Sequence, residues 1–251
     1  MNDVTPHTGP CPSELPLIAL RGEQKRVETA LRGGESLLVL GPRGCGKTRL
    51  LRECTKSVPG TAFVEYSKNF HQLLQGLALA LAQAGHPRLA GFTTFLGAKQ
   101  TSVHLRGILW SALEEEPARI LLDGIEAASF PVLRFFQRIY FVPGMSIIAS
   151  ARDPYTLGAL GRLFWDPKKT VQIRPLGELA AGELFDGAAR HFQITAANTR
   201  EFRARALEAA GGNGGQIVEM CRLAAKPEYK TASGKIKFEL VRIDSLVRTM
   251  G

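Results

Sequence analysis

The most informative segment of the chain is Gly41-Pro42-Arg43-Gly44-Cys45-Gly46-Lys47-Thr48. It follows the apolar run Leu37-Leu38-Val39-Leu40, and residues 49–52 continue after it with the spacing of a helix. A strand, a glycine-rich loop and a helix in this order are the context of a phosphate-binding P-loop. The segment therefore predicts that the chain binds a nucleoside triphosphate. The alternative is an ordinary glycine-rich turn on a basic surface.

The residue types of this segment suit a phosphate chain. Glycines allow backbone conformations and close approaches that a Cβ atom would block. The loop amides and the start of the following helix then direct partial positive charge to one place. We expect Lys47 to reach the β- and γ-phosphates of ATP and the Thr48 hydroxyl to hold Mg²⁺. The expected nucleotide-binding residues are Gly41, Pro42, Arg43, Gly44, Cys45, Gly46, Lys47, Thr48 and Arg49.

The composition is that of a folded, basic protein. The 251 residues are 45% hydrophobic, which allows one sizeable core and a smaller attached domain. Lysine and arginine number 32 against 23 aspartates and glutamates, so the formal net charge is +9. Such an excess favours polyanionic partners such as nucleic acids. A bound nucleotide would itself offset part of the excess, so the charge alone does not identify the partner.

The cysteines and the hydropathy of the chain predict a cytoplasmic protein. The cysteines show no metal-binding spacing, and the N-terminus shows no signal-peptide pattern. We therefore expect Cys11, Cys45, Cys54 and Cys221 to be reduced thiols. The most apolar long segment, residues 73–84, is too short to span a bilayer, so no membrane association is expected.

Apolar strands that alternate with amphipathic helices predict a parallel sheet covered by helices on both faces. One strand, residues 119–123, ends in the carboxylate of Asp123, and another, residues 145–150, ends just before Arg152. Ligands of such sheets bind outside the carboxyl ends of the strands, so Thr48, Asp123 and Ser150-Ala151-Arg152 are expected at one edge. The strands are predicted at residues 37–40, 62–66, 119–123, 145–150 and 170–174.

The strand pattern stops after residue 176, and three helices are predicted between residues 178 and 225. In the tail, Ile236, Phe238 and Leu240 alternate with polar residues, which predicts a strand before a final helix. The chain is accordingly divided into a flexible N-terminal arm (1–16), an α/β core (17–175), a helical lid (176–226) and a short basic strand–helix tail (227–251).

With these features in place, the chain resembles the AAA+ and STAND group of P-loop NTPases. The likeness is to origin-recognition-type ATPases and to the nucleotide-binding domains of apoptotic and plant-resistance proteins. It implies an α/β parallel-sheet P-loop NTPase core with a small C-terminal helical lid, Mg²⁺-dependent ATP binding and ATPase activity. Besides the P-loop, the motifs that carry the likeness are Leu20-Arg21-Gly22-Glu23, with its glycine and arginine transposed, Ile147-Ile148-Ala149-Ser150-Ala151-Arg152, Arg174-Pro175-Leu176 and Gly211-Gly212-Asn213-Gly214-Gly215.

The resemblance implies roles for single residues. Asp123 matches the carboxylate that organises Mg²⁺, with a capping aspartate as the alternative, and Arg152 matches the sensor-1 arginine that detects the γ-phosphate. Arg162 lies where AAA+ rings often place an arginine finger, although a plain surface arginine is the alternative. The expected catalytic residues are Lys47, Asp123, Glu126 and Arg152, and the expected metal ligands are Thr48 and Asp123.

Two departures from the family pattern predict slow or partner-stimulated hydrolysis. Gly124 occupies the position of the glutamate that positions the attacking water, so Glu126 is the nearest candidate base. Its alternative role is that of a helix-start or surface residue. The lid arginine of AAA+ proteins would fall near Gly215 and is missing, as it is in STAND proteins. Each loss can lower the rate by orders of magnitude.

These observations favour an ATP-binding AAA+/STAND-type NTPase whose nucleotide state sets the arrangement of core and lid. The alternative is a nucleotide-dependent DNA-binding helper, similar to transposition or replication loaders, with little turnover of its own. A small-molecule kinase is disfavoured by the lid helices. A protein partner or a second copy of the chain is also open. The tail lysines, which form either a nucleic-acid contact or a solvated face, are Lys226, Lys230, Lys235 and Lys237.

Overall fold

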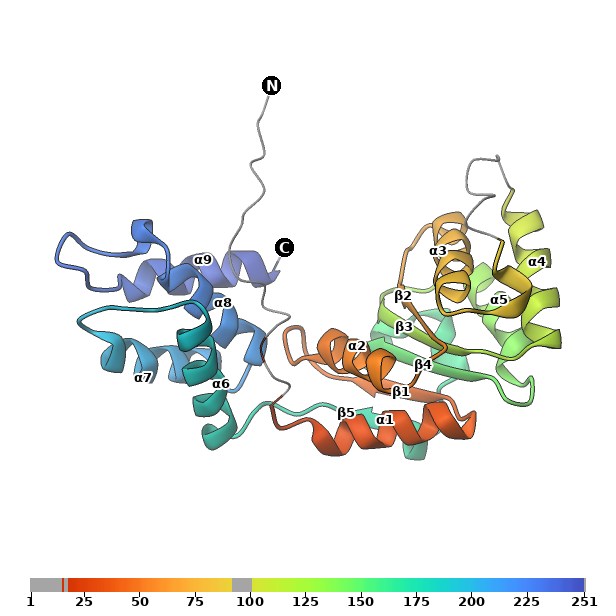
Figure 1. The fold of residues 1–251 in the computed structure, drawn as a ribbon, viewed down its shortest axis with the longest axis horizontal. Helices are drawn as coiled ribbons and strands as arrows, with labels where there is room; N and C mark the ends of the chain where they lie inside the picture. Colours follow the sequence, from red (N-terminus) through yellow and green to blue (C-terminus); the bar gives the residue numbers. More distant parts are fainter. Residues whose placement is uncertain (1–14, 16–17, 92–100, 251) are drawn as a thin grey trace, which may run out of the picture. The chain divides into compact units, whose positions relative to one another are not determined.

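The computed structural model describes Leu15, residues 18–91 and residues 101–250 (Figure 1). The predicted N-terminal arm, except Leu15, lies outside the described residues, as do residues 92–100 of the segment between two predicted helices. The described chain divides into two compact units. The α/β unit consists of Leu20–Pro42 and Gly46–Arg174. The helical unit contains Arg43–Cys45 and the chain from Pro175 onward, together with the described residues before Leu20.

The α/β unit contains a parallel sheet of five strands, in the order β2-β3-β4-β1-β5. All five strands predicted for the α/β core are present: β1 has the predicted bounds, and the other four have ends that differ by one or two residues from the expected ones. β5, for example, ends two residues earlier than its apolar pattern suggested, because only three of its residues pair with β1. The strands are β1 (Leu37–Leu40), β2 (Thr61–Glu65), β3 (Arg119–Ile125), β4 (Ser146–Ala151) and β5 (Thr170–Gln172).

Helices cover both faces of this sheet, because alternate strand residues point to opposite sides and both sets are apolar. On one face α3, α4 and α5 share a core with Leu38, Leu122 and Ala149. On the other face α1 and α2 pack against each other and against the sheet (Figure 1). The helices are α1 (Arg21–Gly33), α2 (Lys47–Ser57), α3 (Phe70–Gln83), α4 (Ser102–Glu115) and α5 (Phe130–Tyr140).

The helical unit is built around a second hydrophobic core. Phe185 and Phe202 lie at its centre, fully buried, with their ring centroids 5.8 Å apart. Ile217, Met220 and Val241 contribute further buried side chains from two more helices. The helices are α6 (Glu178–His191), α7 (Thr199–Ala210), α8 (Gly214–Ala224) and α9 (Phe238–Met250).

The tail differs from its sequence-based prediction. The alternation at residues 236–240 predicted a strand, but α9 begins at Phe238, and Lys230 and Ile236 form only an isolated antiparallel bridge. Phe238 and Val241 are buried and Ser245 is fully buried, a spacing that places all three on one face of a helix. The helical period therefore prevails over the short alternation that precedes it.

Within the described residues, no helix combines the length and the apolar composition that crossing a bilayer requires.

Candidate nucleotide-binding site

The loop after β1 has backbone angles that require glycine. Gly44 and Gly46 have φ angles of 80° and 99°, in the left-handed region that residues with a Cβ rarely adopt. α2 begins at Lys47, and its N-cap is Gly46, which has no side chain to bond the first amides of the helix. Such amides lack partners within the helix, so they are available to an anion.

Lys47 is held by the loop's own backbone. Its Nζ donates to the carbonyl oxygen of Gly41 at 2.6 Å and to that of Pro42 at 3.0 Å. The ammonium group therefore lies at the start of the loop rather than extending into solvent. A phosphate bound in the loop would compete with these two carbonyls for the same donor.

Thr48 and Asp123, the two expected metal ligands, are in direct contact. Asp123 lies near the carboxyl end of β3 and is only 7% exposed. Thr48 Oγ1 donates to Asp123 Oδ2 at 2.6 Å, and Ser150 Oγ donates to Asp123 Oδ1 at 2.5 Å. A carboxylate and a hydroxyl at one point are the hard oxygen ligands that Mg²⁺ prefers. This donor set fits the metal.

A β-bulge positions Asp123. Leu122 pairs with Ala149 and Ile125 with Ala151, so Asp123 and Gly124 both lie opposite Ser150. Ser150 Oγ accepts a hydrogen bond from the Gly124 amide at 2.8 Å while it donates to Asp123. Bulges beside functional sites turn a side chain away from its regular direction. Ser150 thus fixes both the bulge and the carboxylate.

The remaining predicted residues have other surroundings. Glu126 forms an ion pair with Lys68 at 2.9 Å, and both side chains are more than half exposed. Arg49 pairs with Glu53 along α2 at 3.2 Å. Arg152 directly follows β4 and is exposed, and its side chain makes no hydrogen bond or ion pair with any described residue. The structure therefore gathers Thr48 and Asp123, with Ser150, and leaves Glu126 in a separate ion pair.

Arg162, the expected arginine-finger position, lies in a short 3₁₀ turn, Ala159–Arg162. Its guanidinium lies over the Phe130 ring, 5.3 Å from the ring centroid. Such a contact fits the surface-arginine alternative as well as a finger, so the role of Arg162 stays a prediction.

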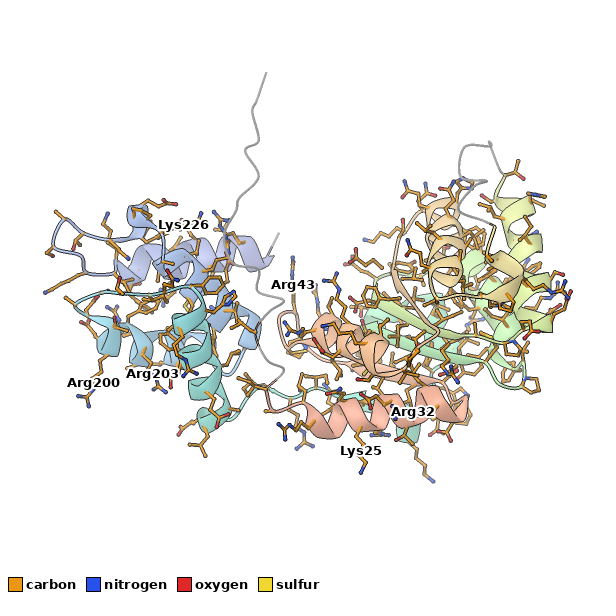
Figure 2. The ribbon with its side chains drawn as sticks, in the orientation of Figure 1. Lys25, Arg32, Arg43, Arg200, Arg203 and Lys226 are labelled. Carbon is orange, nitrogen blue, oxygen red and sulfur yellow. The ribbon has the colours of Figure 1, made fainter. Side chains whose placement is uncertain are left out.

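Within the helical unit, the middle of the P-loop contacts the start of α8. Asn213 Nδ2 donates to the Arg43 carbonyl at 2.8 Å, and the Gly215 amide donates to the Gly44 carbonyl at 2.8 Å. Glycine is required at Gly215, because a Cβ there would lie 2.8 Å from the Gly44 Cα. Asn213 Oδ1 also accepts from the Gln216 amide, so this side chain caps α8. The Arg43 side chain itself is exposed (Figure 2).

The sequence placed Ser150 at this edge of the sheet, but it assigned no side-chain contact to Ser150 or to Asn213. The signal for Ser150 is a hydroxyl residue near the carboxyl end of a fully buried strand. The signal for Asn213 is a capping residue between two glycine pairs. Neither pattern names the partner, because Asp123 and Arg43 lie 27 and 170 residues away.

Thiol chemistry does not fit the two buried cysteines, Cys54 and Cys221. Cys45, Cys54 and Cys221 form no disulfide. Burial raises the pKa of the Cys54 thiol to about 12 and also raises that of Cys221, so neither forms a nucleophilic thiolate near neutral pH. Among the described residues no three histidine, cysteine or acidic side chains cluster as a metal site. Mg²⁺ held by Thr48 and Asp123 would therefore keep water or phosphate oxygens as its other ligands.

Comparison with known proteins identifies solved structures that share this fold. No family model matches the chain, and no curated protein matches it in sequence. Among solved structures, the chain is similar to the Walker-type ATPase PABY2304 of Pyrococcus abyssi, with a TM-score of 0.57 and 15% identity over 93% of this chain and 71% of that one. It is also similar to Aeropyrum pernix Orc1 in complex with DNA, with a TM-score of 0.57 and 15% identity over 94% of this chain and 66% of that one.

A third similar structure is that of Drosophila ORC bound to DNA, with a TM-score of 0.59 and 14% identity over 98% of this chain and 64% of that one. The chain thus has the fold of AAA+ P-loop ATPases of the origin-recognition type, as the sequence predicted. It spans about two thirds of the length of the two origin-recognition proteins.

Proposed function

We propose that the chain binds ATP with Mg²⁺ and hydrolyses it slowly, as an ATPase of the AAA+/STAND kind. The observation that carries the proposal is the hydrogen-bonded group of Thr48, Asp123 and Ser150. Thr48 directly follows the P-loop lysine in the sequence. A glycine-rich turn without a nucleotide would have no need of a buried carboxylate bonded through both oxygens. The fold shared with Walker-type ATPases supports the same function.

The proposed roles follow from the contacts. Lys47 exchanges the Gly41 and Pro42 carbonyls for phosphate oxygens, which are stronger partners because they are charged. Thr48 and Asp123 hold Mg²⁺, which when bound neutralises phosphate charge and orients the phosphates. Ser150 keeps the carboxylate of Asp123 in place by donating to its other oxygen.

Slow hydrolysis is proposed because the groups that usually accelerate ATP hydrolysis are either missing or poorly placed in this chain. Gly124 has no side chain to position a water molecule. Glu126 is the proposed base, and it would have to leave its ion pair with Lys68 to act. A general base contributes about 10²–10⁴-fold to a rate, so a poorly placed one leaves turnover slow. Arg152, exposed at the carboxyl end of β4, is the proposed sensor of the γ-phosphate.

The test of nucleotide binding is the variant Lys47→Ala. Losing a charge-assisted contact should weaken ATP binding by about 1.5–3 kcal/mol in calorimetry. Lys56→Ala is the matched control, because Lys56 lies on the same helix, is exposed and pairs only with Glu53 in the described structure, at 3.0 Å. Exposed pairs of this kind contribute little, so the control should keep wild-type affinity. Equal affinities in all three proteins would contradict the site.

We further propose that nucleotide state sets the arrangement of the core and the helical lid, residues 176–226. The bonds from Asn213 and Gly215 to the loop carbonyls support this proposal, since a loop that rearranges around phosphate would alter the start of α8. Because Gly215 provides no lid arginine, the proposed link between the loop and α8 is the pair of hydrogen bonds from the Asn213 side chain and the Gly215 amide.

A second proposed function is nucleotide-dependent DNA binding with little turnover. It is favoured by the net charge of +9, and two similar structures are those of proteins bound to DNA. ATPase rates with and without DNA separate the two functions. Stimulation by DNA supports a coupled ATPase, while DNA binding with unchanged low turnover supports the helper. The lack of a disulfide among the described cysteines supports a cytoplasmic location, and we also propose a protein partner or a second copy of the chain.

A further inference from the structure

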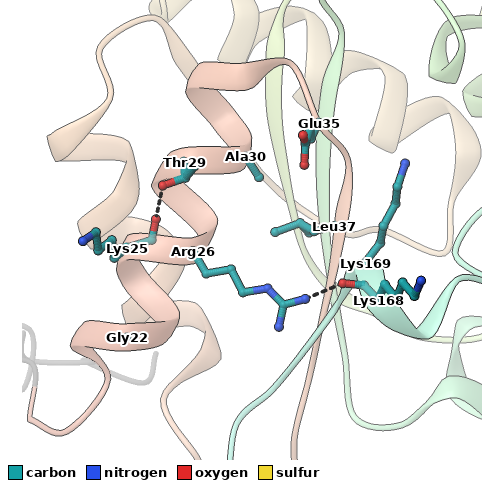
Figure 3. A pocket seen from close by; sticks show the side chains of 9 residues that line it. All are labelled: Gly22, Lys25, Arg26, Thr29, Ala30, Glu35, Leu37, Lys168 and Lys169. Atoms are coloured by element: carbon teal, nitrogen blue, oxygen red, sulfur yellow. Dashed lines mark hydrogen bonds between the residues drawn. The ribbon is translucent and has the colours of Figure 1, made fainter.

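A groove runs between α1 and the segment that leads into β5, entirely within the α/β unit (Figure 3). Its volume is about 380 Å³. Ala30 and Leu37, both buried, form the apolar part of its lining. The charged part of the lining comes from Lys25 and Arg26 on α1 and from Lys168 and Lys169 before β5.

The groove carries an excess of positive charge that the described protein does not neutralise. Four cationic residues line it, against one carboxylate, that of Glu35. The side chains of Lys25, Lys168 and Lys169 make no hydrogen bond or ion pair with any described residue. Arg32, further along the same helix, instead pairs with Glu28 at 3.6 Å. An anionic partner would relieve the repulsion among the groove cations.

The arrangement of these cations suits an extended partner. Arg26 crosses the groove and its guanidinium donates to the Lys168 carbonyl, which joins the two walls (Figure 3). Lys25 and Lys168 point to opposite sides of the groove in Figure 3, and Lys25 projects outward from α1 in Figure 2. A small anion needs donors that converge on one point, whereas a polyanion is held by cations spread along it.

We propose that this groove binds the phosphate backbone of a nucleic acid. The inference rests on the second proposed function, DNA binding, and names its surface. From Gly22 to Ala30 the groove follows α1 for about 12 Å, given a rise of 1.5 Å per residue. One strand of duplex DNA carries a phosphate about every 3.4 Å along its axis, so three or four phosphates match the four cations.

The lysines before β5 and the P-loop lie at opposite ends of the strands. Leu37, in the groove lining, is the first residue of β1, whereas the P-loop follows its last residue, Leu40. Lys168 and Lys169 likewise precede β5 at its amino end. The Gly22 end of the groove is nearer to the P-loop, since Leu20 lies 3.2 Å from where a Cβ on Gly46 would be.

The test compares two triple variants that lose the same charge. The groove variant is Lys25→Ala/Lys168→Ala/Lys169→Ala, and the control is Lys230→Ala/Lys235→Ala/Lys237→Ala, from the basic tail. Affinity for a short fluorescent DNA duplex is measured across a salt titration with saturating ATP. Three lost phosphate contacts should lower the slope of log affinity against log salt by about 2.7 in the groove variant only.

From about 50 to 200 mM salt, the wild type should then lose about 40-fold more affinity than the groove variant. ATP affinity should equal that of the wild type in both variants, which shows that each folds. A wild-type slope in the groove variant, or the same loss in both, would overturn the groove as the DNA surface. A wild type that binds no duplex would overturn DNA binding itself.

Free phosphates are the other source of this chemistry. Inorganic tripolyphosphate, added at the same phosphate concentration as the duplex and with ATP saturating, should not displace the DNA, because the groove cations are spread apart. Displacement that disappears in the groove variant would show a site for small polyphosphates and overturn the assignment to nucleic acid.

Discussion

Ser150 connects two features that determine the chemistry of the site. Its hydroxyl donates to the Asp123 carboxylate and accepts from the Gly124 amide, so one side chain holds both the bulge and the metal ligand. Ser150 is fully buried and Asp123 is only 7% exposed, so water cannot easily replace their hydrogen bond if the hydroxyl is removed. The buried carboxylate oxygen would then lose its partner, and the amide of the exposed Gly124 would lose the bond that fixes the bulge.

The variant Ser150→Ala should therefore lose about 1–3 kcal/mol of folding free energy, because the buried Asp123 oxygen is left without a partner. It should also lose most of the gain in ATP affinity that Mg²⁺ gives, because Asp123 is no longer held. Calorimetry with and without Mg²⁺ measures the second effect. Ser146→Ala is the control: Ser146 is a buried serine at the opposite end of β4, and it donates to the Glu35 carbonyl at 2.6 Å.

Ser146→Ala should lose stability yet keep the full Mg²⁺ effect. If both variants keep the full Mg²⁺ effect on ATP affinity, Ser150 contributes to stability but has no part in holding the metal ligand. Asp123→Asn provides the reference for a site that has lost its metal ligand, with nucleotide affinity near normal when Mg²⁺ is omitted.

Gly124 shows what a sequence can and cannot reveal about a site. The sequence identified a glycine where related enzymes have a glutamate. It could not show that the backbone there has a φ of 73°, since that angle follows from the bulge opposite Ser150. A side chain at a left-handed position costs about 1–2 kcal/mol. A glutamate at this position would therefore be disfavoured by the backbone angle, although a Cβ there would meet no other atom within 4 Å.

At the scale of helices and strands, strong local sequence patterns were enough to predict the structure. The apolar runs of β1, β3 and β4 are buried along their lengths, and the buried face of α1 is the predicted one, Val27, Ala30 and Leu31. The strand predicted in the tail was wrong because a three-residue alternation and a helical period share Phe238. Short patterns of this kind do not separate the two periods, and the packing of Val241 against the helical core decides.

Variants of Asn213 test whether the start of α8 contributes to ATP binding. Asn213→Asp keeps an acceptor for the Gln216 amide, so α8 stays capped, but it cannot donate to the Arg43 carbonyl. Asn213→Ala loses both bonds and should cost about 1 kcal/mol of stability. We expect ATP affinity to fall in both variants by about 0.5–1.5 kcal/mol, since the loop backbone loses a hydrogen bond.

Asn69 is the matched control for this prediction. It caps α3 through the Gln72 amide at 3.1 Å, as Asn213 caps α8. Asn69→Asp and Asn69→Ala should change stability in the same way and leave ATP affinity unaltered. Unchanged ATP affinity in Asn213→Asp would show that the bond to Arg43 has no part in nucleotide binding. Chemical denaturation and calorimetry give the two readouts.

At the scale of the whole molecule, local sequence patterns no longer predict which residues come together. The groove joins residues 22–37 to residues 168 and 169, which the pairing of β5 with β1 and the bond from Arg26 to the Lys168 carbonyl bring together. Sequence reasoning placed the basic surface in the tail, because clustered lysines are visible there and dispersed ones are not. The fold could be predicted from one motif and its flanking strand and helix, whereas surfaces formed by distant segments required the structure.

The proposed switch makes a prediction for the whole chain. Arg152 follows β4 at the carboxyl edge of the sheet, where the third phosphate of ATP is expected. A ligand shifts a conformational equilibrium only by its difference in affinity for the two states, so a residue that contacts the γ-phosphate alone can separate ATP from ADP. We therefore expect α6, α7 and α8 to exchange amide hydrogens more slowly with ATP bound than with ADP.

Arg152→Ala should remove this difference and leave ADP affinity almost unchanged, because ADP lacks the group that Arg152 contacts. Arg134→Ala, on α5, is the control: Arg134 is exposed, and its side chain makes no ion pair with any described residue. It should retain the wild-type difference. Slower exchange in ATP than in ADP by the Arg152 variant would identify another group as the sensor, and the Asn213 variants would then be measured in the same way. Equal exchange with both nucleotides in the wild type would instead remove the switch from the proposal and leave nucleotide binding in place.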